Sequence, residues 1–496
     1  MAYIRFNTVA AITLCCGIGF TLFGYDGGLL SGILTDPRFL KTFHYPSDTL
    51  LGHITATFDL GCFIGAVFST FIGERLGRKR MMIIGCSIHA IGGLLQATAF
   101  KVEHLIAGRA VSGFGNGFVT VTIPIWQSET CSALLRGRLM VLQLTVNIGG
   151  VLIATWLNFG MRYVQSDFSW RFPLAFQCVF ALSCLIMVPF LPESPRWLIT
   201  KRKSSESRKV IARLLEMPLD SDEVARVEMD ILAHVRHEEA LKAETTWRDL
   251  FKNDELQNLK RIILGAGTQY FQQFGGINVI LYYLPVLFQN SIGLSDTMSL
   301  ILTGCNTINL FLATFAATFY VDTFGRKKMM FYGYLAQGIC YTMVAIGLGV
   351  GTKKSQILSI SFIFLYYTCF GMTNCTTAWV YPAEVNSQRY RNLGAAVATA
   401  TNWISNYIVV LITPIGISNI AWRFYIIFAV FNFSFLPLIY LFYVETARFT
   451  LEEIDEIFEE QYHKRKGTTS LRRAVESPAE KEDVKIVENK FEAVDA

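Results

Sequence analysis

Stretches of about 20 predominantly apolar residues recur along this chain, and each is long enough to cross a hydrocarbon layer about 30 Å thick. Lipid cannot hydrogen-bond backbone N–H and C=O groups, so a stretch that crosses it must be helical. Composition agrees, because 52% of the 496 residues are hydrophobic and only 17% are charged, whereas soluble proteins carry about 25% charged residues. The sequence therefore predicts an all-α polytopic membrane protein.

The apolar stretches predict twelve spans in two sets of six. The first set falls near residues 8–30, 52–73, 81–100, 104–124, 139–160 and 172–191. The second set falls near residues 261–289, 297–321, 329–350, 357–380, 393–416 and 422–443. The first stretch is too long for the apolar core of a signal peptide, so we expect it to remain as the first span.

Polar segments separate and follow these two sets. The segment between them is charged and has helical patterns, and the C-terminal tail is rich in Lys, Glu and Ser. We expect the tail to be disordered beyond Tyr462. The predicted organisation is a first bundle at 1–191, a linker at 192–260, a second bundle at 261–444 and a tail at 445–496.

Basic residues gather in the loops on one side of the predicted spans. By counting spans, GERLGRKR, LLRGR, FGRKK and QRYRN all fall on that side, and the loops NSIGLSD and SNIAW on the other side are nearly free of Lys and Arg. Short loops rich in Lys and Arg stay in the cytoplasm. We therefore expect the linker and both termini to be cytoplasmic, in a multi-pass protein of the plasma membrane.

The two halves repeat short motifs at matching positions. GERLGRKRMM at 73–82 is similar to VDTFGRKKMM at 321–330, each after the second span of its half. After the fourth span, each half has a Glu seven residues before an Arg: Glu129 and Arg136, Glu384 and Arg391. Duplicated halves of six spans are typical of transporters that rock one half against the other around a central site. The repeat therefore predicts a transporter.

The duplicated loops have two interpretations. A single basic loop is explained by topology alone. Two copies, each with an acid before it (Glu74 and Asp322) and a Glu and Arg two spans later, favour an ion-pair gate. Such a gate must open in each transport cycle, so partly exposed pairs worth about 1 kcal/mol each suit it better than deeply buried ones.

Two charged residues lie inside predicted spans of the first half. Asp26 lies in FGYDGGLLSG of the first span, and Arg109 lies in AGRAVSGFGNGF of the fourth. Charges inside a membrane are costly unless they face a partner or water, so each is the candidate partner of the other. A held acid and Arg can exchange a proton when a cavity opens, because the Arg favours the charged acid and burial disfavours it. The alternative is a static structural pair.

Side-chain amides gather in the seventh predicted span. FQQFGGINVILYY places Gln272, Gln273 and Asn278 within about two helical turns, so they can line one face. Amides offer both donors and acceptors, which suits an uncharged, polyhydroxylated ligand. Trp379 and Trp403 are candidates for stacking against a sugar ring, although a single Trp is more often a packing residue. We expect substrate binding here.

The sequence offers no metal or catalytic pattern. The 11 Cys residues lie mostly singly in apolar stretches without the spacing of a zinc site. His234 and His237 lie three residues apart in the linker, where a solvated helical face is expected. No nucleophile–base pair is evident. We therefore expect no enzyme, cofactor, metal or nucleic-acid partner, and a protein embedded in the lipid bilayer that is monomeric.

Several motifs in order carry a family resemblance. They are GFTLFGYDGGLLSG, GERLGRKR, GRAVSGFGNG, PIWQSE followed by RGR, SWRFPLAFQ, PESPRWL, QQFGGINVILYY, VDTFGRKK, WVYPAE and VETARFTLEEID. Through about residue 457, the chain resembles the sugar porters of the major facilitator superfamily, especially their fungal members. The resemblance implies the major facilitator fold, with two six-helix bundles and alternating access.

The resemblance also implies roles for individual residues. The residues implied to contact substrate are Gln272, Gln273, Asn278, Trp379, Asn402 and Trp403. The cytoplasmic gate maps to Arg78, Glu129, Arg136, Arg326, Glu384 and Arg391, with Glu193 and Glu445 at acidic positions near it. In proton-coupled members the first-span acid, here Asp26, is the proton site, and it is paired with the fourth-span Arg, here Arg109. Facilitative relatives commonly have a neutral residue at the acid's position, so Asp26 favours symport.

The chain departs from the family pattern at four places. The usual fifth-span Gln falls on Leu144, and the neighbouring Gln143 is turned from that direction by about 100°. The usual eighth-span Asn falls on Leu310, beside Asn309. Cys375-Thr376 replaces the usual Gly-Pro, which removes a helix-breaking proline, and the closing PETKG reads VETAR. Two lost hydrogen bonds of about 1–1.5 kcal/mol each predict weaker hexose binding.

The sequence thus predicts a secondary transporter that takes up a sugar or sugar-like polyol with a proton. One alternative is an exporter or importer of a less polar metabolite, favoured by Leu144, Leu310 and Thr376. Others are a facilitative sugar carrier and a non-transporting sugar sensor. The short tail argues against a sensor, because such sensors usually have long cytoplasmic extensions.

Overall fold

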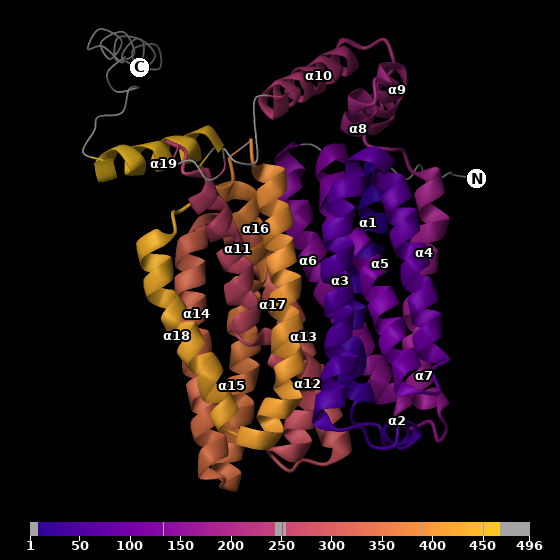
Figure 1. The fold of residues 1–496 in the computed structure, drawn as a ribbon, viewed down its shortest axis with the longest axis vertical. Helices are drawn as coiled ribbons and strands as arrows, with labels where there is room; N and C mark the ends of the chain where they lie inside the picture. Colours follow the sequence, from indigo (N-terminus) through magenta and orange to yellow (C-terminus); the bar gives the residue numbers. More distant parts are fainter. Residues whose placement is uncertain are drawn as a thin grey trace, which may run out of the picture.

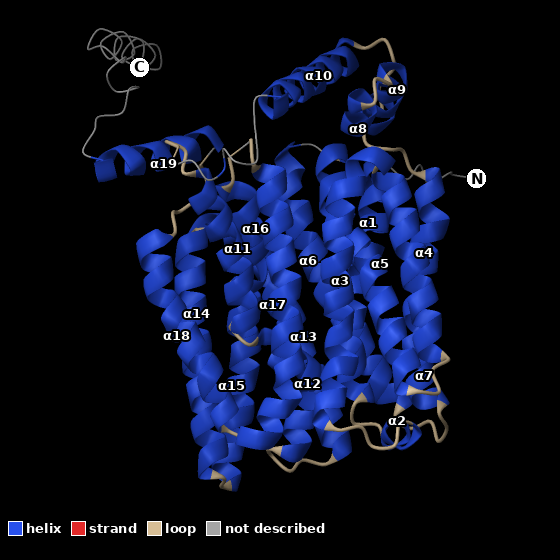
Figure 2. Cartoon of the chain, viewed as in Figure 1, coloured by secondary structure: helices blue, strands red, loops and turns tan. Residues whose placement is uncertain are grey.

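The computed structural model describes residues 8–131, 133–243, 250, 254–387, 389–449 and 451–466, of which the side chains at 133–138, 237–239, 241–243, 322, 392, 451–452 and 465–466 lie outside the described part. Every regular element in these ranges is a helix, as the apolar stretches predict. Figure 2 shows long helices standing side by side and joined by short loops.

The first bundle lies at the right of Figure 1. Its long helices are α1 (Thr8–Ile33), α3 (Asp48–Leu76), α4 (Arg78–Ala97), α5 (Val102–Thr130), α6 (Ala133–Met161) and α7 (Phe168–Met187). A short helix, α2 (Pro37–Thr42), lies between α1 and α3. Asp36 caps it, because its carboxylate accepts a 2.8 Å hydrogen bond from the backbone N–H of Arg38.

The second bundle lies at the left of Figure 1. Its helices are α11 (Asn258–Phe274), α12 (Ile277–Asn290), α13 (Asp296–Phe324), α14 (Arg326–Val350), α15 (Lys353–Met372), α16 (Asn374–Val385), α17 (Arg391–Ile420) and α18 (Arg423–Phe442). Two predicted spans are each broken into two helices, one into α11 and α12 and the other into α15 and α16.

The remaining helices lie outside the bundles. They are the 3₁₀ turn η1 (Val188–Phe190), α8 (Pro195–Thr200), α9 (Ser204–Leu215), α10 (Asp222–Ala243) and α19 (Leu451–Lys466). Figure 1 places α8, α9, α10 and α19 at one end of the molecule, which we call the linker end, and we call the other the opposite end. Helix α19 continues four residues past Tyr462, where disorder is predicted to begin, and residues 467–496 lie outside the described part.

Eleven segments of the described chain are long and apolar enough to cross a membrane, with α11–α12 and α15–α16 each counted as one. Helix α5 is not among them, although its 29 residues at about 1.5 Å each exceed the hydrocarbon thickness. Buried Arg109, Asn116 and Gln127 contribute to its low hydropathy. Because α5 packs against α3 and α4, these side chains face protein. With α5 the spans number twelve, as predicted.

Helix α5 approaches α3 closely through glycines. A Cβ added at Gly113 would lie 2.1 Å from the carbonyl oxygen of Phe58, and one at Gly117 would lie 2.5 Å from that of Cys62. A larger residue at either position would push the two helices apart. This contact holds Arg109, one turn before Gly113, against α3.

The seventh span is broken at two glycines. Gly276 has a φ of +93°, and a Cβ there would lie 2.5 Å from the Tyr341 hydroxyl. The Gly275 carbonyl accepts from the Tyr366 hydroxyl at 2.9 Å and from Asn432 Nδ2 at 3.0 Å, and the Gly276 carbonyl accepts from the Tyr341 hydroxyl at 2.6 Å. Side chains thus satisfy the backbone groups that the break frees inside the membrane.

The tenth span is also broken, without a proline at the break. The predicted span at 357–380 lies within one membrane-crossing segment, but two helices form it, because Thr373 has a φ of −130° and a ψ of −79°. Its hydroxyl donates to the Cys369 carbonyl at 2.6 Å, and its N–H bonds to the Phe370 carbonyl at 3.2 Å, which tightens the last turn of α15. Local side-chain bonding of this kind competes with helix continuation.

Candidate transport site

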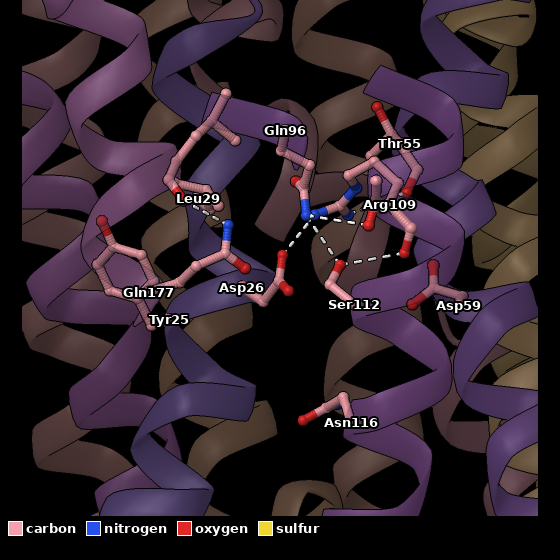
Figure 3. Close-up of polar contacts among 12 residues, drawn as sticks. Tyr25, Asp26, Leu29, Thr55, Asp59, Gln96, Arg109, Ser112, Asn116 and Gln177 are labelled. Atoms are coloured by element: carbon pink, nitrogen blue, oxygen red, sulfur yellow. Dashed lines mark hydrogen bonds and ion pairs between the residues drawn. The ribbon is translucent and has the colours of Figure 1, made fainter. Parts of the chain in front are cut away.

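The predicted pair of Asp26 and Arg109 forms inside the first bundle. Both side chains are fully buried, and Nη1 of Arg109 donates to Oδ1 of Asp26, as Figure 3 shows. Nη2 of Arg109 donates to the Thr55 carbonyl of α3 at 3.2 Å, and the guanidinium lies 4.6 Å from the centroid of the Phe58 ring. A buried charge needs a partner and hydrogen bonds, and Arg109 has both.

A histidine that sequence reasoning missed lies beside this pair. His89 on α4 is fully buried, and its Nδ1 donates to the Ser112 carbonyl at 3.1 Å. Its Nε2 lies 4.0 Å from Oδ2 of Asp26, the oxygen that has no hydrogen-bond partner among the described residues. A second titratable group therefore faces Asp26. The sequence signal that could have identified His89 is that it is a single histidine within the third apolar stretch.

The predicted substrate amides form one hydrogen-bonded cluster in the second bundle. Gln272 Nε2 donates to the Asn374 carbonyl at 3.1 Å, and Asn402 Nδ2 donates to Gln272 Oε1 at 3.3 Å. Asn278 Nδ2 donates to Gln273 Oε1. All of these side chains are buried. The structure thus brings together four predicted amides, which come from α11, α12 and α17.

The spacing argument for these amides needs correction. Gln272 and Gln273 end α11, whereas Asn278 begins α12 after the glycine break. The prediction that the three residues line one face of a continuous helix is therefore wrong. The break itself turns the chain so that Asn278 reaches Gln273.

Two further amides complete the cluster. Gln269 Oε1 accepts from Asn402 Nδ2 at 2.6 Å, and Asn406 Oδ1 accepts from Asn278 Nδ2 at 2.6 Å. Gln269 precedes Gln272 by three residues, and Asn406 follows Asn402 by four. Residues three and four apart share a helix face, so helical spacing was the signal for both.

Asn406 connects this cluster to a second acid in the first bundle. Its Nδ2 donates to Oδ1 of Asp59 on α3 at 2.9 Å, which is a contact between the two bundles. Asp59 is fully buried and lies one turn after Thr55, whose carbonyl binds Arg109. An acid in the second apolar stretch is as unusual as Asp26 in the first, and sequence reasoning missed this signal.

The two predicted tryptophans lie where the bundles meet. Trp403 on α17 is buried, and its ring makes an edge contact with Phe23 of α1 at 5.2 Å between centroids. Trp379 on α16 is half-buried and packs against an apolar cluster of the first bundle that includes Phe20 and Leu144. Both rings thus border the first bundle, beside the helices that carry the amides.

The fifth-span departure has a clear structural outcome. Gln143 is buried, with Nε2 3.4 Å from Gln127 Oε1, and Gln127 Nε2 donates to the Thr13 hydroxyl at 3.0 Å. These contacts stay within the first bundle. The neighbouring Leu144 shares the cluster that Trp379 packs against. An apolar side chain therefore lies near this tryptophan.

The eighth-span departure is similar. Leu310 is fully buried in the main apolar cluster. Asn309 donates to the Phe364 carbonyl at 2.8 Å and accepts from the Thr368 hydroxyl at 3.0 Å, so it fastens α13 to α15. The neighbouring amide is thus engaged in helix packing.

At the linker end, the duplicated loops form duplicated ion pairs. Arg78 binds Glu129 through two hydrogen bonds of 2.8 and 2.7 Å, and both residues belong to the first bundle. Arg326 binds Glu384 through two hydrogen bonds of 3.1 and 2.8 Å in the second bundle. Two parallel bonds fix the geometry of an Arg–carboxylate pair. These four predicted gate residues therefore pair within their own bundles.

Two more predicted acids support these pairs. Glu193 accepts from the backbone N–H of Arg78 at 3.0 Å and from that of the next residue at 3.1 Å. Glu445 accepts from the equivalent N–H groups of Arg326 and its successor at 2.6 and 3.1 Å. Both carboxylates complement the positive N-terminal ends of α4 and α14.

Two predicted gate residues remain. The side chain of Arg136 lies outside the described part of the chain. Arg391 is the first residue of α17 and is half-buried at the linker end. A role of either in joining the bundles stays a prediction.

At the opposite end, polar contacts join the two bundles. Arg162, just after α6, donates through Nε to Oδ2 of Asp296 at the start of α13. The Ser418 hydroxyl of α17 donates to Oδ2 of Asp48 at the start of α3 at 2.6 Å. The opposite end is therefore held together in this conformation.

One group of described side chains has the proximity of metal ligands. Ligand atoms of Glu255, Glu459 and His463 lie within 4.8 Å of one another at the linker end. His463 Nε2 lies 3.8 Å from Glu255 Oε1, and this contact ties α19 to the segment before α11. His234 is exposed, and its Nδ1 donates to the Asp230 carbonyl at 2.7 Å on its own helix.

Comparisons with known proteins agree with this architecture. The "Sugar (and other) transporter" family matches residues 11–458. The MFS-type transporter oryC of Aspergillus oryzae is 41% identical over 457 residues, covering 90% of this chain and 85% of that protein. The sugar transporter STL1 of Saccharomyces cerevisiae is 37% identical over 473 residues, covering 92% and 81%. The solved MFS proton:xylose symporter XylE bound to 6-bromo-6-deoxy-D-glucose has a TM-score of 0.74 at 25% identity, covering 91% of this chain and 99% of that one.

The protein is a membrane transporter of the major facilitator fold. It has two bundles of six spans, spans that are interrupted at a glycine or a threonine, and duplicated ion pairs. The chain belongs to the sugar transporter family of that superfamily. The predicted family, fold and absence of enzymatic activity are therefore confirmed.

Proposed function

We propose that the protein takes up a sugar or sugar-like polyol together with a proton, by alternating access. The observation that carries this proposal is the division of its buried polar groups. Asp26 and Arg109 form a charged pair in the first bundle, and amides gather in the second. A charged pair can respond to a proton, and amides can bind an uncharged cargo.

The amide cluster supports a polyhydroxylated cargo. Its members are Gln269, Gln272, Gln273, Asn278, Asn402 and Asn406. Each amide has donors and acceptors, which match hydroxyl groups that also donate and accept. Trp379 and Trp403 add aromatic surface for the apolar face of a ring. The names of relatives, a sugar transporter and a proton:xylose symporter, agree with this cargo class.

The Asp26–Arg109 pair supports proton coupling. Protonation of Asp26 would remove the charge that Arg109 binds, so the pair would loosen when the acid takes a proton. Opening of the cavity to water would lower the cost of either charge, because solvent replaces the low-dielectric surroundings. The proton gradient is then the driving force, and no cofactor is required.

The two ends of the molecule support an orientation. The linker end carries the basic loops, so we place it and both termini in the cytoplasm of a plasma-membrane protein that acts as a monomer. Contacts such as Ser418–Asp48 then close the outward end in this conformation. The pairs Arg78–Glu129 and Arg326–Glu384 border the inward end, and we propose that they take part in its gating together with Arg136 and Arg391.

A second candidate is the transport of a less polar metabolite. Leu144 and Leu310 are buried where the family pattern has amides. They remove about two hydrogen bonds worth roughly 1–1.5 kcal/mol each. A cargo with fewer hydroxyl groups would lose less at these positions than a hexose.

An uptake screen tests the proposed function. The full chain is expressed in cells that lack their own sugar carriers, and uptake of labelled hexoses, pentoses, disaccharides and polyols is measured at external pH 5 and pH 7. We expect at least one sugar or polyol to accumulate, faster at pH 5, with accumulation lost when a protonophore is added. Accumulation of another metabolite, with no uptake of any sugar or polyol, would refute the sugar assignment. Uptake of a sugar without dependence on the proton gradient would refute the coupling.

A further inference from the structure

Asp59 joins the charged site of the first bundle to the amide cluster of the second. It lies in the middle of α3, is fully buried, and accepts a 2.9 Å hydrogen bond from Asn406. Asn406 in turn accepts from Asn278, which also donates to Gln273. Figure 3 shows Asp59 on the helix next to the one that carries Arg109. Asp59 is thus in direct contact with Asn406, a member of the amide cluster that forms the proposed cargo site.

The charges buried around Asp59 are unbalanced when both acids are ionised. Arg109 is hydrogen-bonded to Asp26. Asp59 receives its hydrogen bond from a neutral amide, and its Oδ2 has no hydrogen-bond partner among the residues that the structure describes. An ionised carboxyl buried without a cation costs several kcal/mol. The closed packing therefore favours a proton on Asp59.

The side chains that face Asp59 do not remove this imbalance. The titratable ones are Arg109 on α5, Asp26 on α1, Cys62 on α3 itself, and Tyr282 and Tyr283 on α12. Arg109 is the cation of this set, and Asp26 already binds it. His89 of α4 faces Asp26 at 4.0 Å, and α17 presents the neutral Asn406.

We propose that Asp59 is a second proton-carrying carboxyl of the transport site, which is protonated when the two bundles close around the cargo. This inference rests on the proposed function and adds a second coupled proton to it. A proton from water on the outer side binds Asp59 while the cavity is open. It leaves to water on the inner side after the cargo has left Asn406 and its neighbours. No other reactant is needed.

The position of Arg109 makes the two acids interdependent. Its Nη2 binds the Thr55 carbonyl, one turn before Asp59 on the same helix. In the wild type, Asp26 can return to its ionised form and pair with Arg109 after its proton has left, whereas a neutral amide at this position leaves Asp59 as the acid that neutralises Arg109 at every stage of the cycle. Asp26→Asn is therefore expected to hold Asp59 ionised and to disable both proton sites. Asp59→Asn leaves Asp26 and Arg109 intact and disables one.

The test determines how many protons are transported with each cargo molecule from the cargo gradient that a known pH difference can maintain. The full chain is reconstituted in lipid vesicles at zero membrane potential with the outside one pH unit more acidic. The probe is whichever of D-glucose, D-xylose, D-galactose, sorbitol and glycerol the wild-type chain accumulates best. The internal cargo concentration is varied until net flux is zero. The ratio of internal to external cargo concentration at that point is the accumulation ratio that the pH difference supports. One pH unit supports about tenfold per coupled proton, because it is worth about 1.4 kcal/mol.

We expect a ratio of about 100 for the wild type and about 10 for Asp59→Asn, a tenfold loss. Glu103→Gln, which neutralises an exposed carboxyl on α5, should keep the wild-type ratio. Equal ratios in the wild type and Asp59→Asn would overturn the inference while leaving proton coupling intact. If Asp59→Asn does not fold, the wild-type ratio decides, since about 10 means one proton and contradicts a second carrier. A wild-type ratio of about 1 would instead refute the proposed function.

Discussion

At the linker end, the two bundles carry matching ion pairs, Arg78–Glu129 in the first and Arg326–Glu384 in the second. Each pair follows a glycine with positive φ and lies beside a carboxylate that caps a helix. At mid-depth the bundles differ. The first holds the buried charged pair of Asp26 and Arg109, whereas the second holds the larger hydrogen-bonded cluster of amides.

The ion pairs that the bundles share fit a function common to both bundles, and the buried polar groups that differ fit functions that belong to one bundle each. Both must move against each other, so both keep the pairs that border the linker end. Proton binding needs a titratable acid, and cargo binding needs donors and acceptors that stay uncharged. The two halves share the ion pairs at the linker end and differ in the buried polar groups at their centre, which fits the proposed division between gating, proton binding and cargo binding. Asp59 and Asn406 connect the two chemistries across the boundary.

The largest effect is expected from Arg109→Gln, which removes the buried ion pair with Asp26 in the first bundle. The change leaves Asp26 buried without its cation, which costs about 3–5 kcal/mol of folding free energy. We expect a markedly lower midpoint of thermal unfolding in detergent and loss of all transport. Purified protein and cargo exchange in vesicles measure the two effects.

Arg226→Gln is the matched control for this change. Arg226 lies on α10 with 69% of its side chain exposed and pairs with Glu223 three residues earlier. An exposed pair is worth about 0–1 kcal/mol, so unfolding and transport should be nearly unchanged. Equal unfolding midpoints for Arg109→Gln and Arg226→Gln would show that the buried pair does not stabilise the first bundle.

A smaller effect is expected from Asn402→Ala on the uncharged side. The change removes hydrogen bonds to Gln269 and Gln272. If the cargo loses one bond of about 1–1.5 kcal/mol, KM should rise about tenfold with little change in maximal rate. Asn419→Ala is the control, because Asn419 is exposed on the same helix and bonds to its own backbone. The same KM in both variants would remove Asn402 from the cargo site.

The smallest effects are expected where the bundles are alike. Glu129→Gln and Glu384→Gln each weaken an Arg–carboxylate pair whose side chains are between 7% and 25% exposed. Each pair is worth about 1 kcal/mol, so net uptake should change by a few-fold, to a similar extent in both variants. Initial rates in vesicles measure this. A loss of transport in one variant beside normal uptake in the other would contradict the equivalence of the two pairs.

Most of the fold follows from the sequence because length and hydropathy decide it. The twelve spans and the gate motifs follow from apolar stretches and from the repeated loops, which act locally. The breaks at Gly276 and Thr373 do not follow in the same way. The break at Gly275 and Gly276 depends on the Tyr366 hydroxyl, which donates to the Gly275 carbonyl, and on the Tyr341 hydroxyl, which donates to the Gly276 carbonyl, and both tyrosines lie far away in the chain.

The candidate site is predictable to a lesser extent. Asp26 and Arg109 stand out because a charge in an apolar stretch is costly, and the same reasoning would find Asp59. Asn406 has a weaker signal, its helical spacing of four residues from Asn402, which does not show that it contacts the first bundle. Only the packing of α17 against α3 shows that Asn406 reaches Asp59. Contacts between the bundles were thus the part that sequence spacing did not show.

The most direct test of the central claim is the gradient that Asp26→Asn supports in vesicles with a pH difference of one unit. We expect the variant to exchange labelled cargo across the membrane but to reach equal concentrations on both sides, while the wild type and Glu103→Gln accumulate it. Accumulation by Asp26→Asn to the wild-type level would contradict the assignment of proton coupling to the first bundle.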